Sequence, residues 1–154
     1  MSTSDYLAPV PAPDPDPAHP VLLGFDPGRD KCGVAVMDGD RTIVRHEVVA
    51  SSEAIAAIHA ILLTFQVQHI VLGDQTTSST WKKRLEQELP TPVPIHLVDE
   101  RYTTLEARDR YWQLYPPSGM QRLIPQSLRT IPRPIDDIVA IILIERHLAA
   151  TDSG

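Results

Sequence analysis

The sequence has few of the residues on which several classes of protein depend. It contains one cysteine among 154 residues, Cys32, so no disulfide can form within the chain. That scarcity indicates a reducing compartment, and the apolar surroundings of Cys32 predict a small core residue rather than a nucleophile. The six histidines show none of the close spacings that are typical of zinc ligands, which argues against a zinc site.

Positive charge and long apolar runs are also scarce. Lys and Arg number 14 against 20 Asp and Glu, a net charge of −6, which argues against binding nucleic acid through bulk charge. A local basic patch combined with a metal ion remains open. No apolar run approaches the roughly 20 residues that cross a bilayer, and residues 1–20 lack the basic start and apolar stretch of a secretory signal. We expect a soluble, cytoplasmic protein with no membrane partner.

Proline is concentrated at the N-terminus. Residues 1–20 hold six of the 15 prolines, alternating with Ala and Asp. Such a segment buries too little apolar surface to fold, so we expect a disordered Pro-rich leader over 1–20. The remaining residues, 21–150, are expected to form one domain, because 42% hydrophobic and 22% charged residues suit a single compact core.

The segment 21–38 predicts a β-hairpin whose first strand ends in a carboxylate. An apolar run stops at Asp26, a Pro27-Gly28 turn follows, and a second apolar run begins at Gly33. Gly28 and Gly33 leave room for a ligand or a neighbouring backbone. Asp26 would stand at the end of a buried strand and face a cleft, although an ordinary turn aspartate has the same local pattern.

Apolar periodicity predicts the rest of the architecture. Strands are expected over 42–50, 69–74 and 94–100, helices over 53–66, 78–89, 103–115 and 135–149, and a loop over 116–131. Strands joined by hairpins are antiparallel, whereas strands reached through helical crossovers are parallel to the first. We therefore predict an α/β fold with a mixed five-stranded sheet, three antiparallel and then two parallel strands, flanked by helices.

Acidic residues stand at the ends of these elements. They are Asp26, Asp74 and Asp99-Glu100 after strands, and Asp136-Asp137 at the start of the last helix. Open α/β sheets bind ligands beyond the carboxyl ends of their strands, so these acids should meet. Two carboxylates about 4 Å apart repel by roughly 4 kcal/mol, and the cluster therefore needs a cation or a proton. Oxygen ligands select Mg²⁺ or Mn²⁺, and two such ions can clamp a phosphodiester.

Three motifs carry a resemblance to a known family. They read Asp26-Pro-Gly-Arg-Asp-Lys-Cys-Gly-Val-Ala-Val, Asp99-Glu-Arg-Tyr-Thr-Thr-Leu-Glu-Ala and Ile135-Asp-Asp-Ile-Val-Ala-Ile-Ile-Leu. These are similar to the DxGxxxxGVA, DERxTTxEA and D-x-x-x-A-x-x-I-L motifs of the YqgF/RuvX family of Holliday junction resolvase-like and pre-16S rRNA nucleases. The resemblance covers about Val21–Leu148, and the second motif is the most specific. It implies an RNase H-like fold and a Mg²⁺- or Mn²⁺-dependent nuclease for pre-16S rRNA ends or branched DNA.

The resemblance also implies a site. Carried over position by position, it gives three catalytic, metal-binding carboxylates: Asp26, Glu100 and Asp136. The spacing to Ala140 favours Asp136 over Asp137, and Asp137 stays a further candidate ligand. Asp74 is another, because the family's Gly-Leu-Pro turn is Gly73-Asp74-Gln75 here, and related Holliday junction resolvases carry a glutamate near this place.

A basic segment offers contacts for nucleic acid. Residues 101–133 contain six arginines against two acids. A planar guanidinium suits phosphate, and the loop 116–131 could close over a strand. The expected substrate-binding residues are Arg101, Thr103, Arg108, Arg122, Arg129 and Arg133. A solvated helix face balanced by acids elsewhere is the alternative interpretation.

Two other functions are compatible with parts of this pattern. An actin-like ATPase shares the Asp-x-Gly hairpin but needs a second phosphate-binding domain, for which 154 residues leave no room. A catalytically weak or inactive RNase H-like adaptor would keep the same fold. The sequence leaves open RNA or DNA, endonuclease or exonuclease, and monomer or homodimer.

Overall fold

The computed structural model describes residues 16–152. The leader predicted over 1–20 therefore lies, as far as residue 15, outside the described residues. Within the described part, no helix is both long enough and apolar enough to span a membrane.

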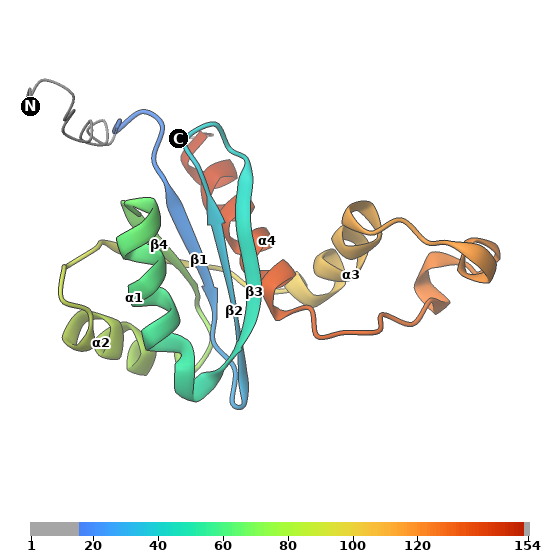
Figure 1. Ribbon diagram of the computed structural model, residues 1–154, viewed down its shortest axis with the longest axis horizontal. Coiled ribbons are helices and arrows are strands. Elements are labelled where there is room, and N and C mark those ends of the chain that lie inside the picture. Colours follow the sequence, from blue (N-terminus) through green and yellow to red (C-terminus); the bar gives the residue numbers. More distant parts are fainter. Residues whose placement is uncertain (1–15, 153–154) are drawn as a thin grey trace, which may run out of the picture.

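A five-stranded mixed sheet forms the centre of the molecule (Figure 1). Its strands are β1 (Leu22–Asp26), β2 (Lys31–Met37), β3 (Ile43–Ala50), β4 (His69–Gly73) and β5 (Ile95–Val98), in the order β3-β2-β1-β4-β5. Strands β1, β2 and β3 pair antiparallel, whereas β4 and β5 run parallel to β1. The predicted sheet, three antiparallel strands followed by two parallel ones, is confirmed.

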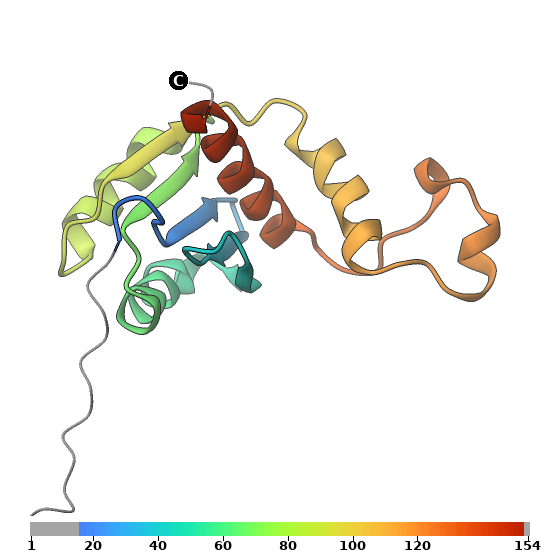
Figure 2. The ribbon, with the colours of Figure 1, turned by 90° about the horizontal axis from the view of Figure 1, so that it is seen from above.

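Helices cover both faces of this sheet (Figures 1 and 2). They are α1 (Ala54–Phe65), α2 (Ser78–Glu88), α3 (Thr103–Leu114) and α4 (Asp136–Asp152), with 3₁₀ turns at Ser51–Glu53, Gly119–Leu123 and Gln126–Leu128. Helices α1 and α2 lie on one face and α4 crosses the other, while α3 packs on the side of α4 away from the sheet.

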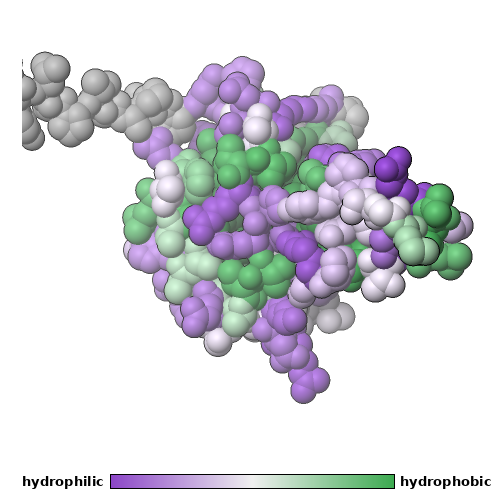
Figure 3. Space-filling view, turned by 45° about the vertical axis from the view of Figure 1, so that its right-hand side comes forward, coloured by the Kyte–Doolittle hydropathy of each residue, from purple (hydrophilic) through white to green (hydrophobic). Residues whose placement is uncertain are grey.

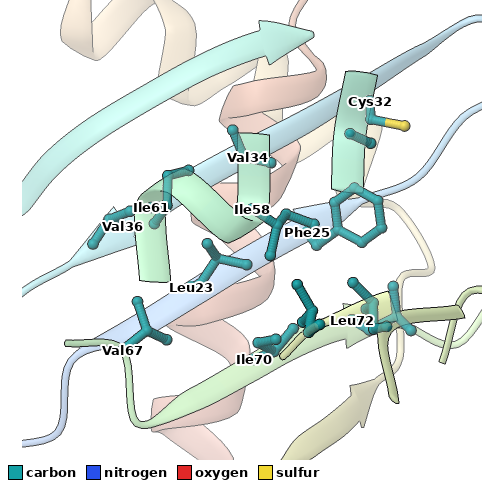
Figure 4. Close-up of a cluster of buried hydrophobic side chains, with 13 residues drawn as sticks. Leu23, Phe25, Cys32, Val34, Val36, Ile58, Ile61, Val67, Ile70 and Leu72 are labelled. Carbon is teal, nitrogen blue, oxygen red and sulfur yellow. The ribbon is translucent and has the colours of Figure 1, made fainter. Parts of the chain in front are cut away.

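Strand alternation divides the core into two layers. Leu23 and Phe25 point toward α1 and α2, where they pack with Ile58 (Figure 4). Leu22 points the other way and packs against Ile141 of α4. Because side chains alternate along a strand, Asp26 belongs to the same face as Leu22. The last residue of β1 therefore presents its carboxylate toward α4.

Residues 116–134, which we name the arm, extend away from the body between α3 and α4 (Figure 1). Two arginines hold its shape: Arg108 Nη2 donates to the Arg129 carbonyl at 3.2 Å, and Arg129 Nε donates to the carbonyls of Gln121 and Ile124. Its outer end is apolar (Figure 3), with Leu123 83% exposed. The predicted loop is thus a projection whose shape is fixed by hydrogen bonds from arginine side chains to main-chain carbonyls.

Candidate active site

Asp26 stands between two positions that have no side chain. In the sheet it is the partner of Gly33 on β2. On its other side, Phe25 pairs with Leu72 of β4, so the next residue of that strand is Gly73. The sheet surface around the carboxylate is therefore open on the face that α4 covers, and other groups can approach it from both sides.

The space where a side chain would stand at these two glycines is filled by the other acidic segments. A Cβ at Gly33 would overlap the carbonyl oxygen of Asp136, so the first turn of α4 lies directly on β2. A Cβ at Gly73 would overlap a carboxylate oxygen of Glu100, so that side chain lies over β4. The two glycines thus bring Asp136 and Glu100 to either side of Asp26, and three acids far apart in the sequence converge at one end of the sheet.

The charges in this group are not compensated. Burial, followed by the negative charges of Asp136 and Glu100, raises the pKa of Asp26 from 3.8 to about 7. Burial also raises the pKa of Glu100, with smaller contributions from Asp74 and Asp99. Within residues 16–152, none of the three converging acids forms an ion pair with Lys or Arg. The arrangement favours a bound cation or a retained proton.

The donor set suits a hard divalent ion. Carboxylate oxygens are the ligands that Mg²⁺ and Mn²⁺ prefer, and no histidine or cysteine belongs to the group. In the described part of the chain, no three such side chains already converge closely enough to hold an ion. Asp26, Glu100 and Asp136 would therefore complete a site by rotating their side chains toward one another.

The neighbouring acids Asp136 and Asp137 have different surroundings. Asp137 is fully buried and accepts hydrogen bonds from His46 Nδ1 at 2.7 Å and from Arg133 Nη2 at 2.6 Å. These contacts direct Asp137 toward β3 and away from Asp26. Arg133, expected to bind substrate, is engaged in the same pair. The pairing of Arg133 with Asp137 could be predicted from their spacing of four residues. The contact of Asp137 with His46 could not, because the two residues are 91 positions apart in the sequence.

The turn after β5 positions Glu100. Thr103, which is buried, donates from Oγ1 to the Glu100 carbonyl at 2.8 Å, so its role here is to hold that segment. Tyr102 adopts a left-handed conformation with φ of 64°, which tightens the turn. Asp74 is exposed and accepts from the Glu100 amide at 3.3 Å, which places it at the edge of the acidic group. Arg101 is exposed and bonds to the carboxylate of Asp99.

The arginines are spread rather than gathered at the acids. Arg108 and Arg129 bond to main-chain carbonyls, Arg129 within the arm. Arg122 is exposed on the arm and forms no ion pair with the described acids. Of the residues predicted from sequence, the structure therefore brings together Asp26, Glu100 and Asp136 with Asp74 at their edge. It distributes the basic residues along α3 and the arm.

Comparison with known proteins identifies the family. The protein-family model described as "RuvX: Holliday junction resolvase" matches residues 20–150 of this chain. The chain belongs to the RuvX family. Among the curated relatives, a "Putative pre-16S rRNA nuclease" of Psychrobacter sp. (strain PRwf-1) is 30% identical, over 88% of this chain and 81% of the relative. A protein of the same name from Legionella pneumophila (strain Lens) is 28% identical, over 86% of this chain and 97% of the relative.

Solved structures agree on the fold. The chain resembles T. thermophilus RuvC in complex with Holliday junction substrate, with a TM-score of 0.51 and 20% identity, over 87% of this chain and 96% of that chain. At this identity the likeness concerns the fold alone. Together with the RuvX match, it confirms the RNase H-like architecture and the family resemblance that the three motifs indicated.

Proposed function

We propose that this chain is a metal-dependent nuclease that hydrolyses phosphodiester bonds in structured nucleic acid. The observation that carries the proposal is the convergence of Asp26, Glu100 and Asp136 without a cationic partner, together with the raised pKa of Asp26. Membership of the RuvX family and relatives named as pre-16S rRNA nucleases support it. Carboxylates placed this close repel one another, so the group needs a cation or a proton to offset its charge.

Some residues of the chain would bind the metal ion, and others position those ligands. Asp26, Glu100 and Asp136 would hold Mg²⁺ or Mn²⁺, and Asp26 must release its proton to do so. When bound, such ions supply a nucleophilic water and stabilise the leaving oxygen of the phosphodiester. Thr103 fixes the Glu100 carbonyl, and the absence of a side chain at Gly33 lets α4 deliver Asp136. The protein thereby pre-positions its acids on a strand end, a turn and a helix start.

Contacts to the substrate backbone are assigned to the arm. Residues 116–134 contain three arginines and no Asp or Glu, in a chain whose net charge is −6. The arm continues directly into Asp136, so a nucleic-acid strand bound along it would pass beside the acidic group. Arg122 is the arginine best placed for this role, since Arg129 and Arg133 are engaged by the protein itself.

We propose pre-16S rRNA ends as the substrate, because the curated relatives carry that name. Branched DNA is the second candidate, since the family model is described as a Holliday junction resolvase and the RuvC neighbour was solved with a junction. Labelled pre-rRNA ends, single-stranded RNA and a four-way junction should be incubated with Mg²⁺, Mn²⁺ or EDTA. The preferred substrate should be cut only with metal.

Asp26→Asn should lose this cleavage while keeping the fold, and Asp30→Asn serves as its control. Asp30 is an exposed acid in the adjacent turn whose carboxylate makes no hydrogen bond or ion pair with the described residues. Cleavage that survives in Asp26→Asn would refute the assignment of the site. Binding without cleavage of any substrate would instead favour a nucleic-acid adaptor.

A further inference from the structure

A cavity opens on the side of the β1–β2 turn away from the acidic group. Its volume is about 610 Å³, and it lies between that turn, the start of α1 and the start of α2. Arg29, Ser52, Thr77 and Arg84 contribute polar side chains to its wall. Among the described residues, no Asp or Glu lines it. A cavity with two arginines, several hydroxyls and no acid is suited to an anion.

The cavity is joined to the acidic group through the main chain. Pro27, which lines the cavity, directly follows Asp26. Gln75 Nε2 donates to the Pro27 carbonyl at 2.7 Å, and Ser51 Oγ donates to the Gly28 carbonyl at 2.9 Å. These bonds fasten the turn to the loops before α2 and α1. The cavity wall and the position of Asp26 are therefore parts of one rigid unit.

Both arginines are available to a ligand. Arg84 lies over the ring of Trp81, 4.6 Å from its centroid, and Trp81 in turn packs edge-on against Phe25. Only its Nε is engaged, with Glu88 at 2.9 Å, a pairing between half-exposed side chains that contributes little. Arg29 is exposed and has no ion pair with the described acids. Stacking holds the Arg84 guanidinium in place and leaves its terminal nitrogens free.

A cavity of similar size elsewhere shows the opposite arrangement. It measures about 650 Å³ and lies beside β5, α3 and the end of α4. There Arg101 is paired with Asp99, and Arg146 bonds to Glu106 at 2.7 Å. Its arginines are thus neutralised by acids that line the same wall. The contrast marks the free arginines of the cavity lined by Arg29 and Arg84 as a feature that the fold does not itself require.

We propose that the cavity lined by Arg29 and Arg84 binds a backbone phosphate of the substrate strand, next to the phosphate that meets Asp26. This inference rests on the proposed nuclease function. The Ser78 amide at the start of α2 donates to the Gln75 carbonyl at 2.9 Å, and the positive end of the helix dipole adds to the positive character of the wall. The volume exceeds what one phosphate needs and leaves room for the attached nucleoside. The occupant is therefore a strand segment rather than a free anion.

Binding without cleavage tests the proposal. Labelled single strands of RNA and DNA are titrated in EDTA into the Asp26→Asn protein and into the same protein carrying Arg29→Gln, Arg84→Gln or both. Each substitution should weaken binding roughly tenfold, as expected for the loss of a charged hydrogen bond. The double variant should also reduce the slope of log affinity against log salt by about 1.4.

The matched control is Lys83→Gln with Arg45→Gln, which removes the same charge from exposed positions outside the cavity. It should retain the affinity that the double cavity variant loses, and equal binding by the two double variants would overturn the proposal. Among residues 16–152 the exposed Arg29 side chain forms no ion pair, so Arg29→Gln should leave the fold intact and alone decides the matter if Arg84→Gln unfolds.

Inorganic phosphate separates the two sources of the ligand. At the concentration of the labelled strand it should leave binding unchanged, and displacement of the strand by phosphate would assign the cavity to a free anion and overturn the proposal. Failure of the nuclease function would appear separately, as missing metal-dependent cleavage in the unsubstituted protein. The binding measurement contains neither metal nor cleavage, so the two failures are distinguishable.

Discussion

Replacing Asp26 by asparagine should stabilise the metal-free protein at neutral and alkaline pH. The unfolded chain loses the Asp26 proton near the ordinary pKa of 3.8, whereas the folded protein keeps it until about pH 7. Between these values the folded state binds more protons than the unfolded state, so the Asp26 contribution to stability falls as pH rises and is lowest above pH 7. Asparagine removes this pH-dependent penalty because it carries no charge.

The magnitude follows from the same shift. A rise of the Asp26 pKa from 3.8 to about 7 corresponds to about 4 kcal/mol at about 1.4 kcal/mol per unit. Asp26 is not fully buried, and solvent screening reduces the effect, so we expect a gain of about 1 to 3 kcal/mol above pH 7. For a domain of this size that is about 2 to 4 °C in Tm per kcal/mol.

Urea and thermal unfolding in EDTA test this at about pH 8 and about pH 5. Asp26→Asn should be the more stable protein at the higher pH, and the difference should shrink at the lower one. Asp30→Asn, the exposed control, should change the stability at neither pH. A millimolar addition of Mg²⁺ or Mn²⁺ should then stabilise the unsubstituted protein and not Asp26→Asn, since only an ionised site binds the ion. An Asp26→Asn protein less stable than the unsubstituted one at about pH 8 would refute the reasoning.

Three further predictions concern packing and pH. Asp137→Ala should destabilise the fold by about 3 kcal/mol in urea, because it removes a fully buried carboxylate that pairs with the partly buried His46 and Arg133. Asp136→Ala should not. Gly33→Ala should cost about 2 to 4 kcal/mol and abolish metal-induced stabilisation, since its Cβ displaces the start of α4. Burial and neighbouring imidazoles lower the pKa of His69 and His147, so stability should fall as pH drops below 6.5, as urea midpoints will show.

Each of these three predictions would be contradicted by a specific result. Equal losses in the two aspartate variants would show that Asp137 has no special structural role. A Gly33→Ala protein with full stability would mean that α4 does not rest on β2 as described. For the histidines, a variant carrying both His69→Gln and His147→Gln should flatten the acid side of the profile. An unchanged profile would place the acid sensitivity elsewhere.

The sheet could be predicted because its strands are short apolar runs bounded by turn residues. The run expected over 69–74 is β4 at His69–Gly73. The edge strand was expected over 94–100 but comprises only Ile95–Val98. It ends early because the Asp99 carboxylate accepts from the Arg101 amide at 2.9 Å and opens a turn. A local hydrogen bond of this kind leaves no trace in an apolar pattern.

The end of the last helix was underestimated for a similar reason. It was expected over 135–149, whereas α4 runs to Asp152. Arg41, from the turn between β2 and β3, bonds to the Asp152 carboxylate through both terminal nitrogens, at 2.8 and 2.9 Å. Polar residues at a helix end carry no periodic signal, and a partner more than a hundred residues away is invisible to any local window.

Candidate site residues could be found where one segment carries the signal. Asp26 and Glu100 close predicted strands, so the topology alone brings them to one edge. The cavity lined by Arg29 and Arg84 could not be found in this way. Its wall combines the β1–β2 turn, the starts of α1 and α2 and the loop after β4. None of these segments has a distinctive pattern alone, and only their packing places Arg29 and Arg84 around one space.

The spacing between Asp136 and Ala140 has a physical meaning that favours Asp136 over Asp137 as the site residue. Consecutive helix residues point about 100° apart, so the side chains of two adjacent acids leave the helix in different directions. Residues four apart share a stripe, and Ala140 lies on the stripe of Asp136. A Cβ at Gly24 of β1 would overlap the Ala140 carbonyl, just as one at Gly33 would overlap that of Asp136. This stripe therefore runs along β1 and β2 toward Asp26, while Asp137 is turned toward His46 on β3. A small residue four positions after an acid indicates that the helix lies close against the sheet there, and the acid at the head of that stripe is the one that can reach the strand end.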